Sequence, residues 1–275
     1  MLPKLISFGS FYLPTYGVLV ALGFLAGLAV TVRLSRRSGL NPELMTNLAV
    51  YVALAGMLGA KILMIVFDWK TRFSANPGQI FSLDTLQAAG VFQGGLILAL
   101  ITAYFYMRHQ GLPLLAASDA FAPGVALGHA IGRLGCLAAG CCWGTVCKLP
   151  WAITFHNPDA YALTGVPLEQ PLHPSQLYEF STEGVLAGFL YWRYGKAHAP
   201  GKIIGLYLVL SSVARFLIEF TRFHEQALPF GLALSITQWI ALGLAAAGAV
   251  LLYRTRDAKG MPAGPEIRPT KLLRV

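Results

Sequence analysis

The sequence predicts an all-α integral membrane protein with seven transmembrane helices, an outer N-terminus and a cytoplasmic C-terminus. Three observations support this fold class: the composition, the number of long apolar runs, and the distribution of basic residues between them. Charged residues make up 12% of the 275 and hydrophobic residues 56%, and the mean hydropathy is +0.60. Soluble domains contain about 25% charged residues, so the chain is expected to reside in a membrane.

The apolar runs define the predicted helices in order. A helix that crosses a bilayer needs roughly 20 mostly apolar residues. Seven segments qualify, at about 11–32, 46–67, 91–107, 116–136, 178–194, 203–221 and 232–253. The fourth is the least apolar because it contains Asp119, His129 and Arg133. The first run is already long enough to span and lacks the layout of a cleavable signal peptide, so the N-terminus is expected to be retained.

Basic residues set the orientation of these spans, since cytoplasmic loops are enriched in lysine and arginine. One set of loops with the C-terminal tail holds thirteen of the 21, the other set holds five, and three lie within spans. The richer set is assigned to the cytoplasm, which places the segment from about 136 to 177 outside. We expect one catalytic transmembrane domain over 1–254 and a basic cytoplasmic tail over 255–275. The net charge of +9 lies in short clusters, which favours anionic lipid over nucleic acid as a partner.

Charges within the spans indicate where a site lies, because burying a charge in a bilayer costs several kcal/mol. Arg133 is one case; Arg215 and Glu219, one helical turn apart in SSVARFLIEFTRF, are another, and Arg222 follows at the outer end of that helix. Two interpretations are open. The pair could serve only to lower its own burial cost while Arg133 snorkels, or two guanidinium groups from separate helices could bind a lipid phosphate bidentately. Lys61 is a further cation within a span, and it could either snorkel to the surface or belong to a site.

The stretch GRLGCLAAGCCWG, residues 132–144, follows the apolar part of the fourth span. Its glycines allow close approach of a backbone or a ligand. Helix packing accounts equally well for Gly128 and Gly132, so only the glycines from Gly135 onward indicate a site.

Five stretches resemble the prolipoprotein diacylglyceryl transferases in order and spacing. They are LPTYGVLVALGF (13–24), FQGGLI (92–97), GRLGCLAAGCCWG (132–144), HPSQLYE (173–179) and GLYLVLSSVARFLIEFTR (205–222). The resemblance covers nearly the whole chain, and HPSQLYE and RFLIEFTR are its specific parts. It implies an enzyme of the bacterial inner membrane that needs no cofactor. Such an enzyme moves the diacylglyceryl group of phosphatidylglycerol onto the lipobox cysteine thiol of a prolipoprotein signal peptide and releases glycerol phosphate.

The resemblance also implies the site. The catalytic residues it assigns are Arg133, Arg215 and Glu219, and the substrate-binding residues are Tyr16, Gln93, Gly94, Gly95, Gly132, Gly144, His173 and Arg222. Because phosphate is the leaving group, two preorganised arginines can stabilise the charge that accumulates on its oxygens. His129, one turn before Arg133, is the candidate base, and His173 is a second candidate.

The chain departs from the family pattern at several polar positions. Gln93 stands where the family usually has histidine, and glutamine cannot take a proton near neutral pH. Cys136, Ala139 and Cys141 stand where the family has two asparagines and an acidic residue, and Ser211 replaces a tyrosine. These changes leave open a paralogue with a different acceptor. A lipid-binding or transport protein, which would use the arginines only to dock head groups, is also open.

The four cysteines, Cys136, Cys141, Cys142 and Cys147, fall within twelve residues. On an oxidising outer face, a disulfide from Cys147 to one of the others is expected. Small apolar filling of the altered positions is equally compatible with the sequence, and a catalytic thiol is a further interpretation. The run lacks the paired Cys-x2-Cys knuckles of common zinc sites, so no metal is expected.

Overall fold

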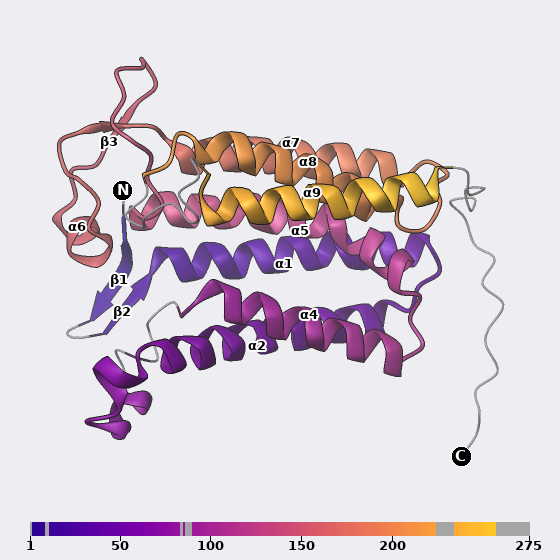
Figure 1. Cartoon of the computed structure of the whole chain (residues 1–275), viewed down its shortest axis with the longest axis horizontal. Coiled ribbons are helices and arrows are strands. Elements are labelled where there is room, and N and C mark those ends of the chain that lie inside the picture. The colour runs from indigo at the N-terminus through magenta and orange to yellow at the C-terminus, as the bar shows by residue number, and fades with distance from the viewer. Residues whose placement is uncertain (1, 9–10, 83–84, 86–89, 224–233, 257–275) are drawn as a thin grey trace. The chain divides into compact units, whose positions relative to one another are not determined.

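The computed structural model describes residues 2–8, 11–82, 85, 90–223 and 234–256, and that part of the chain is mostly helical (Figure 1). Each of the seven segments predicted to be helical contains a helix. These are α1 (Thr15–Arg37), α2 (Pro42–Phe67), α4 (Phe92–His109), α5 (Leu114–Ala139), α7 (Ser175–Tyr194), α8 (Lys202–Glu219) and α9 (Ile236–Thr255). Among the described residues, four helices are long and apolar enough to cross a membrane, namely α1, α2, α5 and α9.

Shorter elements lie between the helices. They are β1 (Lys4–Phe8), β2 (Phe11–Pro14), η1 (Trp69–Phe73), η2 (Pro77–Phe81), β3 (Ile153–Thr154), α6 (Pro158–Thr164) and β4 (Pro171–Leu172). Residues 11–14, predicted to begin the first span, instead form a strand antiparallel to β1. Pro14 explains the boundary: it has extended dihedral angles and directly precedes α1, and a proline also disfavours helical geometry in the residue before it.

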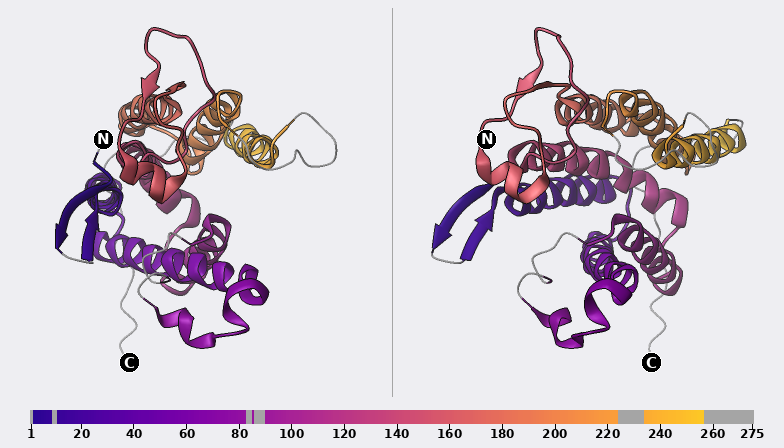
Figure 2. Two further views of the ribbon diagram at one scale, coloured as in Figure 1. Left: turned by 90° about the vertical axis from the view of Figure 1, so that its left-hand side faces the viewer. Right: turned by 60° about the vertical axis from the view of Figure 1, so that its left-hand side comes forward.

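The chain forms two compact units, Met1–Gly39 with Ser118–Val275 and Leu40–Ala117. In the second unit, α2 packs along α4, and the backbones meet where Gly59 faces Gly94. In the first unit, α1 packs on α5: a Cβ added at Gly27 would lie 2.5 Å from the carbonyl oxygen of Gly124. Figure 2 shows α8 alongside α9 in the same unit. Small residues thus allow helices to approach closely, as is usual within membranes.

Asp119 explains part of the polarity of the fourth predicted span. Its carboxylate is buried and accepts hydrogen bonds from the backbone N–H groups of Gly201 at 2.7 Å and Ile204 at 2.8 Å. These groups lie at the start of α8, where a helix has unsatisfied donors and a partial positive charge. Asp119 therefore links α5 to α8.

The segment between α5 and α7 forms a small core of its own. Phe155, Ala160, Val166 and Leu172 are buried together there, and Lys4 pairs with Asp159 of α6 at 2.8 Å. Gly140 enters this segment with a φ of 79°, a left-handed conformation that favours glycine.

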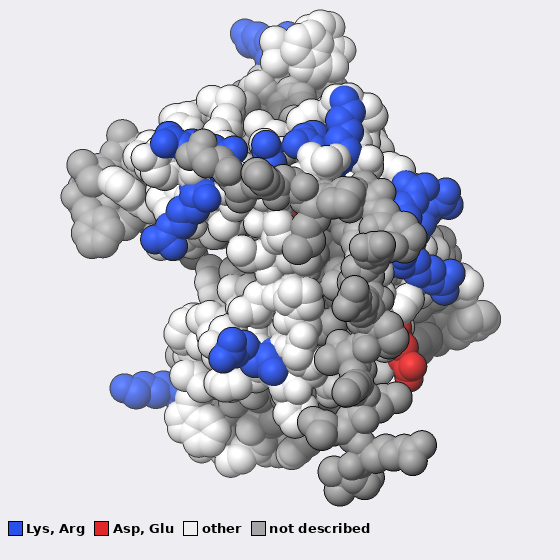
Figure 3. All heavy atoms as spheres, turned by 90° about the vertical axis from the view of Figure 1, so that its right-hand side faces the viewer, with Lys and Arg blue, Asp and Glu red and all other residues white. Residues whose placement is uncertain are grey.

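The surface is consistent with a lipid environment. Large apolar side chains of α2 are exposed, including Leu54, Met57, Leu58, Ile62 and Val66. Basic residues occupy the last turns of α1 and α9. Figure 3 views the end at which these two helices terminate, and lysine and arginine side chains are spread over it. The predicted tail lies, from residue 257 on, outside the described residues.

Candidate functional site

The site centres on Glu179, which is buried on α7 and binds arginine side chains from two other helices and the segment after them. Its Oε2 lies 2.8 Å from Nε of Arg133, on α5. Its Oε1 lies 2.6 Å from Nη1 of Arg215, on α8, and 3.6 Å from Nη1 of Arg222. Arg133 and Arg215, which were predicted to act together, thus contact the same carboxylate.

Glu219 supplies the second carboxylate. Its Oε2 lies 3.0 Å from Nη2 of Arg215 and 3.9 Å from Nη1 of Arg222. Ser235 donates a hydrogen bond to its Oε1 at 3.1 Å. The expected pair of Arg215 and Glu219 is present, and both residues belong to a larger cluster. Three guanidinium groups thus face these two carboxylates, and a third carboxylate, that of Glu183, lies beside His129.

His129 lies beside the cluster, one turn before Arg133. Its Nε2 accepts a hydrogen bond from Nε of Arg133 at 3.1 Å, and its Nδ1 lies 3.4 Å from Oε1 of Glu183. Ser211 also donates to that carboxylate oxygen. With Nε2 as acceptor, Nδ1 holds the proton and faces Glu183. A carboxylate that orients a neutral imidazole leaves the other ring nitrogen available as a base.

Helical periodicity explains why these side chains meet. Each of three helices contributes two polar residues four positions apart: His129 and Arg133 on α5, Glu179 and Glu183 on α7, and Arg215 and Glu219 on α8. Residues at this spacing lie on one helical face. The side chains of the three arginines are 15–22% exposed, so their remaining N–H groups can reach a ligand.

Gly144 holds the segment between α5 and α7 against the end of α8. Its N–H donates to the carbonyl of His173 at 3.1 Å, and the N–H of Thr145 donates to that of Thr221 at 2.9 Å. A Cβ at Gly144 would lie 2.5 Å from the Cβ of His173 and 2.6 Å from the carbonyl oxygen of Thr221. Because Gly144 also forms a backbone bridge with Arg222, it positions one of the three arginines.

Three other expected residues lie in the same unit. His173 Nδ1 is 3.3 Å from the hydroxyl of Tyr178, and no contact between His173 and Glu179 is found among the described residues. The ring of Tyr16, at the start of α1, packs on Gly135. A Cβ at Gly132 would meet nothing within 4 Å, so the backbone there is open rather than used for helix packing.

Gln93, Gly94 and Gly95 belong to the other compact unit, in the first turn of α4. Gly94 and Gly95 pack against glycines of α2, and Gln93 is exposed. Their assignment to substrate binding stays a prediction. Lys61 lies in this unit too, and its ammonium group donates to the carbonyl of Thr85 at 2.6 Å.

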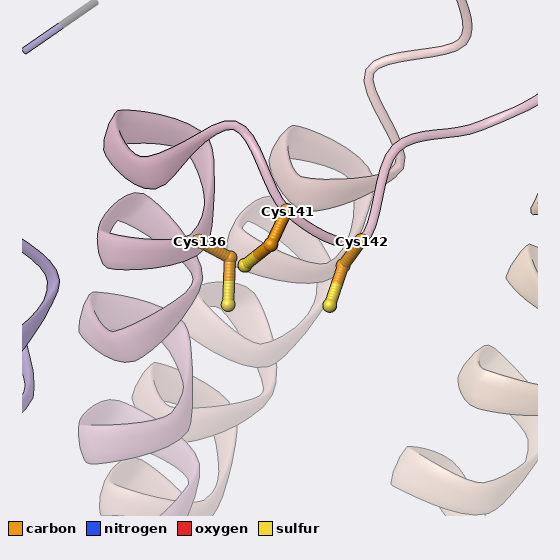
Figure 4. A group of neighbouring side chains, drawn as sticks. All are labelled: Cys136, Cys141 and Cys142. Carbon is orange, nitrogen blue, oxygen red and sulfur yellow. The ribbon is translucent and has the colours of Figure 1, made fainter. Parts of the chain in front are cut away.

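The four cysteines are free thiols, so the expected disulfide from Cys147 is not formed. The sulfur atoms of Cys136, Cys141 and Cys142 all lie within 4.8 Å of one another (Figure 4). Cys147 is not in that group; its backbone N–H instead donates to the carbonyl of Pro171. The backbone of Cys147 is thus paired with β4, the strand before α7, and this pairing keeps its side chain away from the other three cysteines.

The sequence reasoning missed two residues of the cluster. They are Glu179, which lies in HPSQLYE, and Glu183, one helical turn further on. Both fall inside the predicted fifth span, so the rule that charges within a span mark a site applies to them as it does to Arg133. Because the two glutamates are four residues apart, they are also expected to lie on one face of the helix.

Comparison with known proteins relates the chain to one family. The family model described as prolipoprotein diacylglyceryl transferase matches residues 3–254. The phosphatidylglycerol–prolipoprotein diacylglyceryl transferase of Clostridium tetani is 34% identical over 75% of this chain and 80% of its own length. The proteins of that name from Ruegeria pomeroyi and Methylobacillus flagellatus are each 33% identical, over 86% and 91% of this chain and 89% and 95% of their own lengths.

Proposed function

Because the chain belongs to the prolipoprotein diacylglyceryl transferase family, we propose that it transfers the diacylglyceryl group of phosphatidylglycerol to the thiol of a prolipoprotein cysteine. In this reaction, the thiol sulfur forms a bond to the glyceryl carbon. The bond from that carbon to the phosphate oxygen breaks, and glycerol phosphate leaves. The acceptor thiol loses its proton in the process, since the thiolate is the nucleophile.

The observation that carries the proposal is the convergence of Arg133, Arg215 and Arg222 around Glu179 and Glu219. The three guanidinium groups offer positive charge and N–H donors to an anionic phosphodiester. Each guanidinium has five N–H donors in a planar fork, more than the two carboxylates occupy. The buried carboxylates hold the forks in place before substrate arrives, so little reorganisation is needed as charge accumulates on the leaving phosphate.

His129 is the base in this scheme. Its Nε2 faces the arginine cluster, and Glu183 holds the opposite nitrogen. An incoming thiol close to Arg133 could pass its proton to Nε2, which would give up the hydrogen bond from Arg133. The family relation also supports placement in the bacterial inner membrane, with seven spans and an outer N-terminus. The cluster would then lie toward the outer leaflet, where signal peptides of exported precursors emerge.

The test uses purified protein in micelles that contain phosphatidylglycerol and a lipobox peptide. Glycerol phosphate release is expected, and Arg133→Ala and Arg215→Ala should abolish it. Arg36→Ala, at the far end of α1, is the matched control and should keep full turnover. Lipid binding without release by the wild-type protein would overturn the proposal in favour of a lipid-binding protein.

A second assay distinguishes the acceptor. In a strain depleted of its own transferase, the chain should restore lipidation of a model lipoprotein. Failure despite good expression, together with glycerol phosphate release in vitro, would indicate a transferase with a different acceptor.

A further inference from the structure

The cysteine group is the feature that the arginine cluster does not explain. Cys136 extends from the last turns of α5, and Cys141 and Cys142 extend from the loop that follows (Figure 4). Cys136 is buried, and the other two are partly accessible. In the sequence these cysteines lack the spacing of common zinc sites. The chain turns back after Gly140, however, and this turn brings Cys141 and Cys142 close to Cys136.

The distances suit a metal ion. In a tetrahedral site with zinc–sulfur bonds of about 2.3 Å, neighbouring sulfur atoms lie about 3.8 Å apart. The three sulfur atoms here are already within 4.8 Å of one another, so side-chain rotations alone can bring them to that separation. Thiolate ligands select soft ions such as zinc and cuprous copper.

Positively charged side chains lie beside the cysteine group. Nη1 of Arg133 lies 3.8 Å from the sulfur of Cys136. The guanidinium groups of Arg133 and Arg222 are also close to Cys142. An anionic metal–thiolate complex would be stabilised by the same two cations.

The backbone also holds the group together at a cost. Cys142 has a φ of 60°, a left-handed conformation that residues other than glycine seldom adopt. Such a conformation costs about 1–3 kcal/mol and persists only where the surroundings impose it. Here it accompanies the placement of the Cys142 sulfur within 4.8 Å of the two other sulfur atoms.

We propose that Cys136, Cys141 and Cys142 bind one Zn²⁺ ion, and that its fourth position takes the acceptor thiol as a thiolate. The described part of the chain adds no fourth histidine, cysteine or carboxylate to the group, and three protein ligands with an open position are typical of catalytic zinc. The second half of this proposal rests on the proposed transferase function.

The reaction at the metal balances without a redox partner. Three thiols lose three protons as Zn²⁺ forms three zinc–sulfur bonds, and a water molecule fills the fourth position. The acceptor thiol then displaces that water and gives one further proton to His129, the base of the proposed reaction, because a thiol coordinated to zinc is deprotonated. The acceptor sulfur would be held as a thiolate beside Arg133, next to the phosphate site.

The first test measures metal content. The protein is purified in micelles under a phosphine reductant, incubated with Zn²⁺ and freed of excess, and then examined by mass spectrometry of the metal. We expect one zinc per chain, and a loss of at least tenfold in Cys136→Ser, Cys141→Ser and Cys142→Ser. Cys147→Ser, outside the group, is the matched control and should keep its zinc. A wild-type protein without zinc, or a Cys142→Ser variant that retains it, would overturn the site.

The second test examines the fourth position and does not depend on how a variant folds. Wild-type protein is stripped with a chelator and reloaded with Co²⁺, whose absorption reports tetrahedral thiolate coordination. A lipobox peptide should strengthen the sulfur-to-cobalt band, whereas the same peptide with serine in place of cysteine should not. An unchanged spectrum would overturn binding of the acceptor to the metal.

The same samples separate this inference from the transferase proposal. Glycerol phosphate release that is equal with zinc present and removed would overturn the metal's role and leave the transferase function standing. No release in the zinc-loaded protein, despite a spectral response to the cysteine peptide, would instead overturn the transferase function.

Discussion

At the scale of single residues, Glu179 organises the site more than any residue that the sequence singles out. One buried carboxylate accepts a hydrogen bond from Arg215 at 2.6 Å and forms an ion pair with Arg133 at 2.8 Å, with a third guanidinium at 3.6 Å. Removing one partner from a buried ion pair leaves uncompensated charge and costs about 3–5 kcal/mol. Here three positive groups would lose their shared counter-charge together.

Glu179→Gln should therefore lower both stability and turnover. The neutral amide keeps the shape of the side chain but cannot offset three guanidinium groups, so we expect a loss of about 3–5 kcal/mol in unfolding free energy. Thermal unfolding in micelles and glycerol phosphate release measure the two effects. Glu169→Gln is the control, since its carboxylate is exposed and pairs only at the surface with His156, where about 0–1 kcal/mol is at stake. Equal effects of the two substitutions would contradict the role of Glu179.

Arg133→Lys tests whether the fork geometry matters or only the charge. Arg133 contacts Glu179 through Nε, and its Nη1 points toward Cys136, so a single ammonium cannot reproduce both contacts. We expect kcat to fall about 100-fold or more, in line with the loss of one preorganised donor. Steady-state kinetics check this, with Arg36→Lys as the conservative control. Near-normal turnover in Arg133→Lys would count against bidentate phosphate binding.

At the scale of elements, glycines set how closely the helices pack. α1 and α5 meet through Gly23 and Gly27 on one side and Gly124 and Gly128 on the other. This contact positions the start of α1, with Tyr16, against the part of α5 that bears Arg133. Helix packing, which was one interpretation of both Gly128 and Gly132, therefore holds for Gly128 and not for Gly132.

Gly27→Ala should destabilise the α1–α5 pair. The added Cβ would lie 2.5 Å from the carbonyl oxygen of Gly124, and a backbone atom cannot rotate away. Overpacking of this kind costs about 1–3 kcal/mol. Gly243→Ala is the control on α9, because a Cβ there meets nothing within 4 Å. The thermal unfolding midpoint should fall for Gly27→Ala alone; a midpoint unchanged in both variants would refute the packing argument.

At the scale of the whole molecule, the charge of the loops predicts the membrane orientation. Basic side chains occupy the last turns of α1, α7 and α9, which are the ends that the sequence assigns to the cytoplasm. Anionic lipids of the inner leaflet attract such residues. The outer segment between α5 and α7 would then face the compartment that exported precursors enter.

Cysteine labelling tests this orientation. A membrane-impermeant maleimide should label Tyr161→Cys, which is exposed on α6, in intact spheroplasts. Lys196→Cys, exposed after α7, should react only after the membrane is permeabilised. The parent protein, with its four native cysteines, sets the background. The reverse pattern would invert the topology.

The helices were predictable because apolar runs of membrane length leave the backbone few alternatives: its polar groups must bond within the segment. The start of α1 differs, because Pro14 ends a strand before the helix begins. The pair of Arg215 and Glu219 was predictable from spacing along one helix. Glu179 could have been found in the same way, since it also lies within a predicted span.

The sequence by itself determined that the chain is an all-α membrane protein and to which family it belongs, and it singled out the two arginines, because composition, periodicity and motif order are local properties of the chain. Only the tertiary structure decided what those arginines bind and which cysteines meet. Glu179 joins residues more than 35 positions apart on three segments, and Cys136 reaches Cys141 and Cys142 through a turn at Gly140. Such contacts depend on how helices pack and where loops reverse, and sequence spacing does not encode those distances.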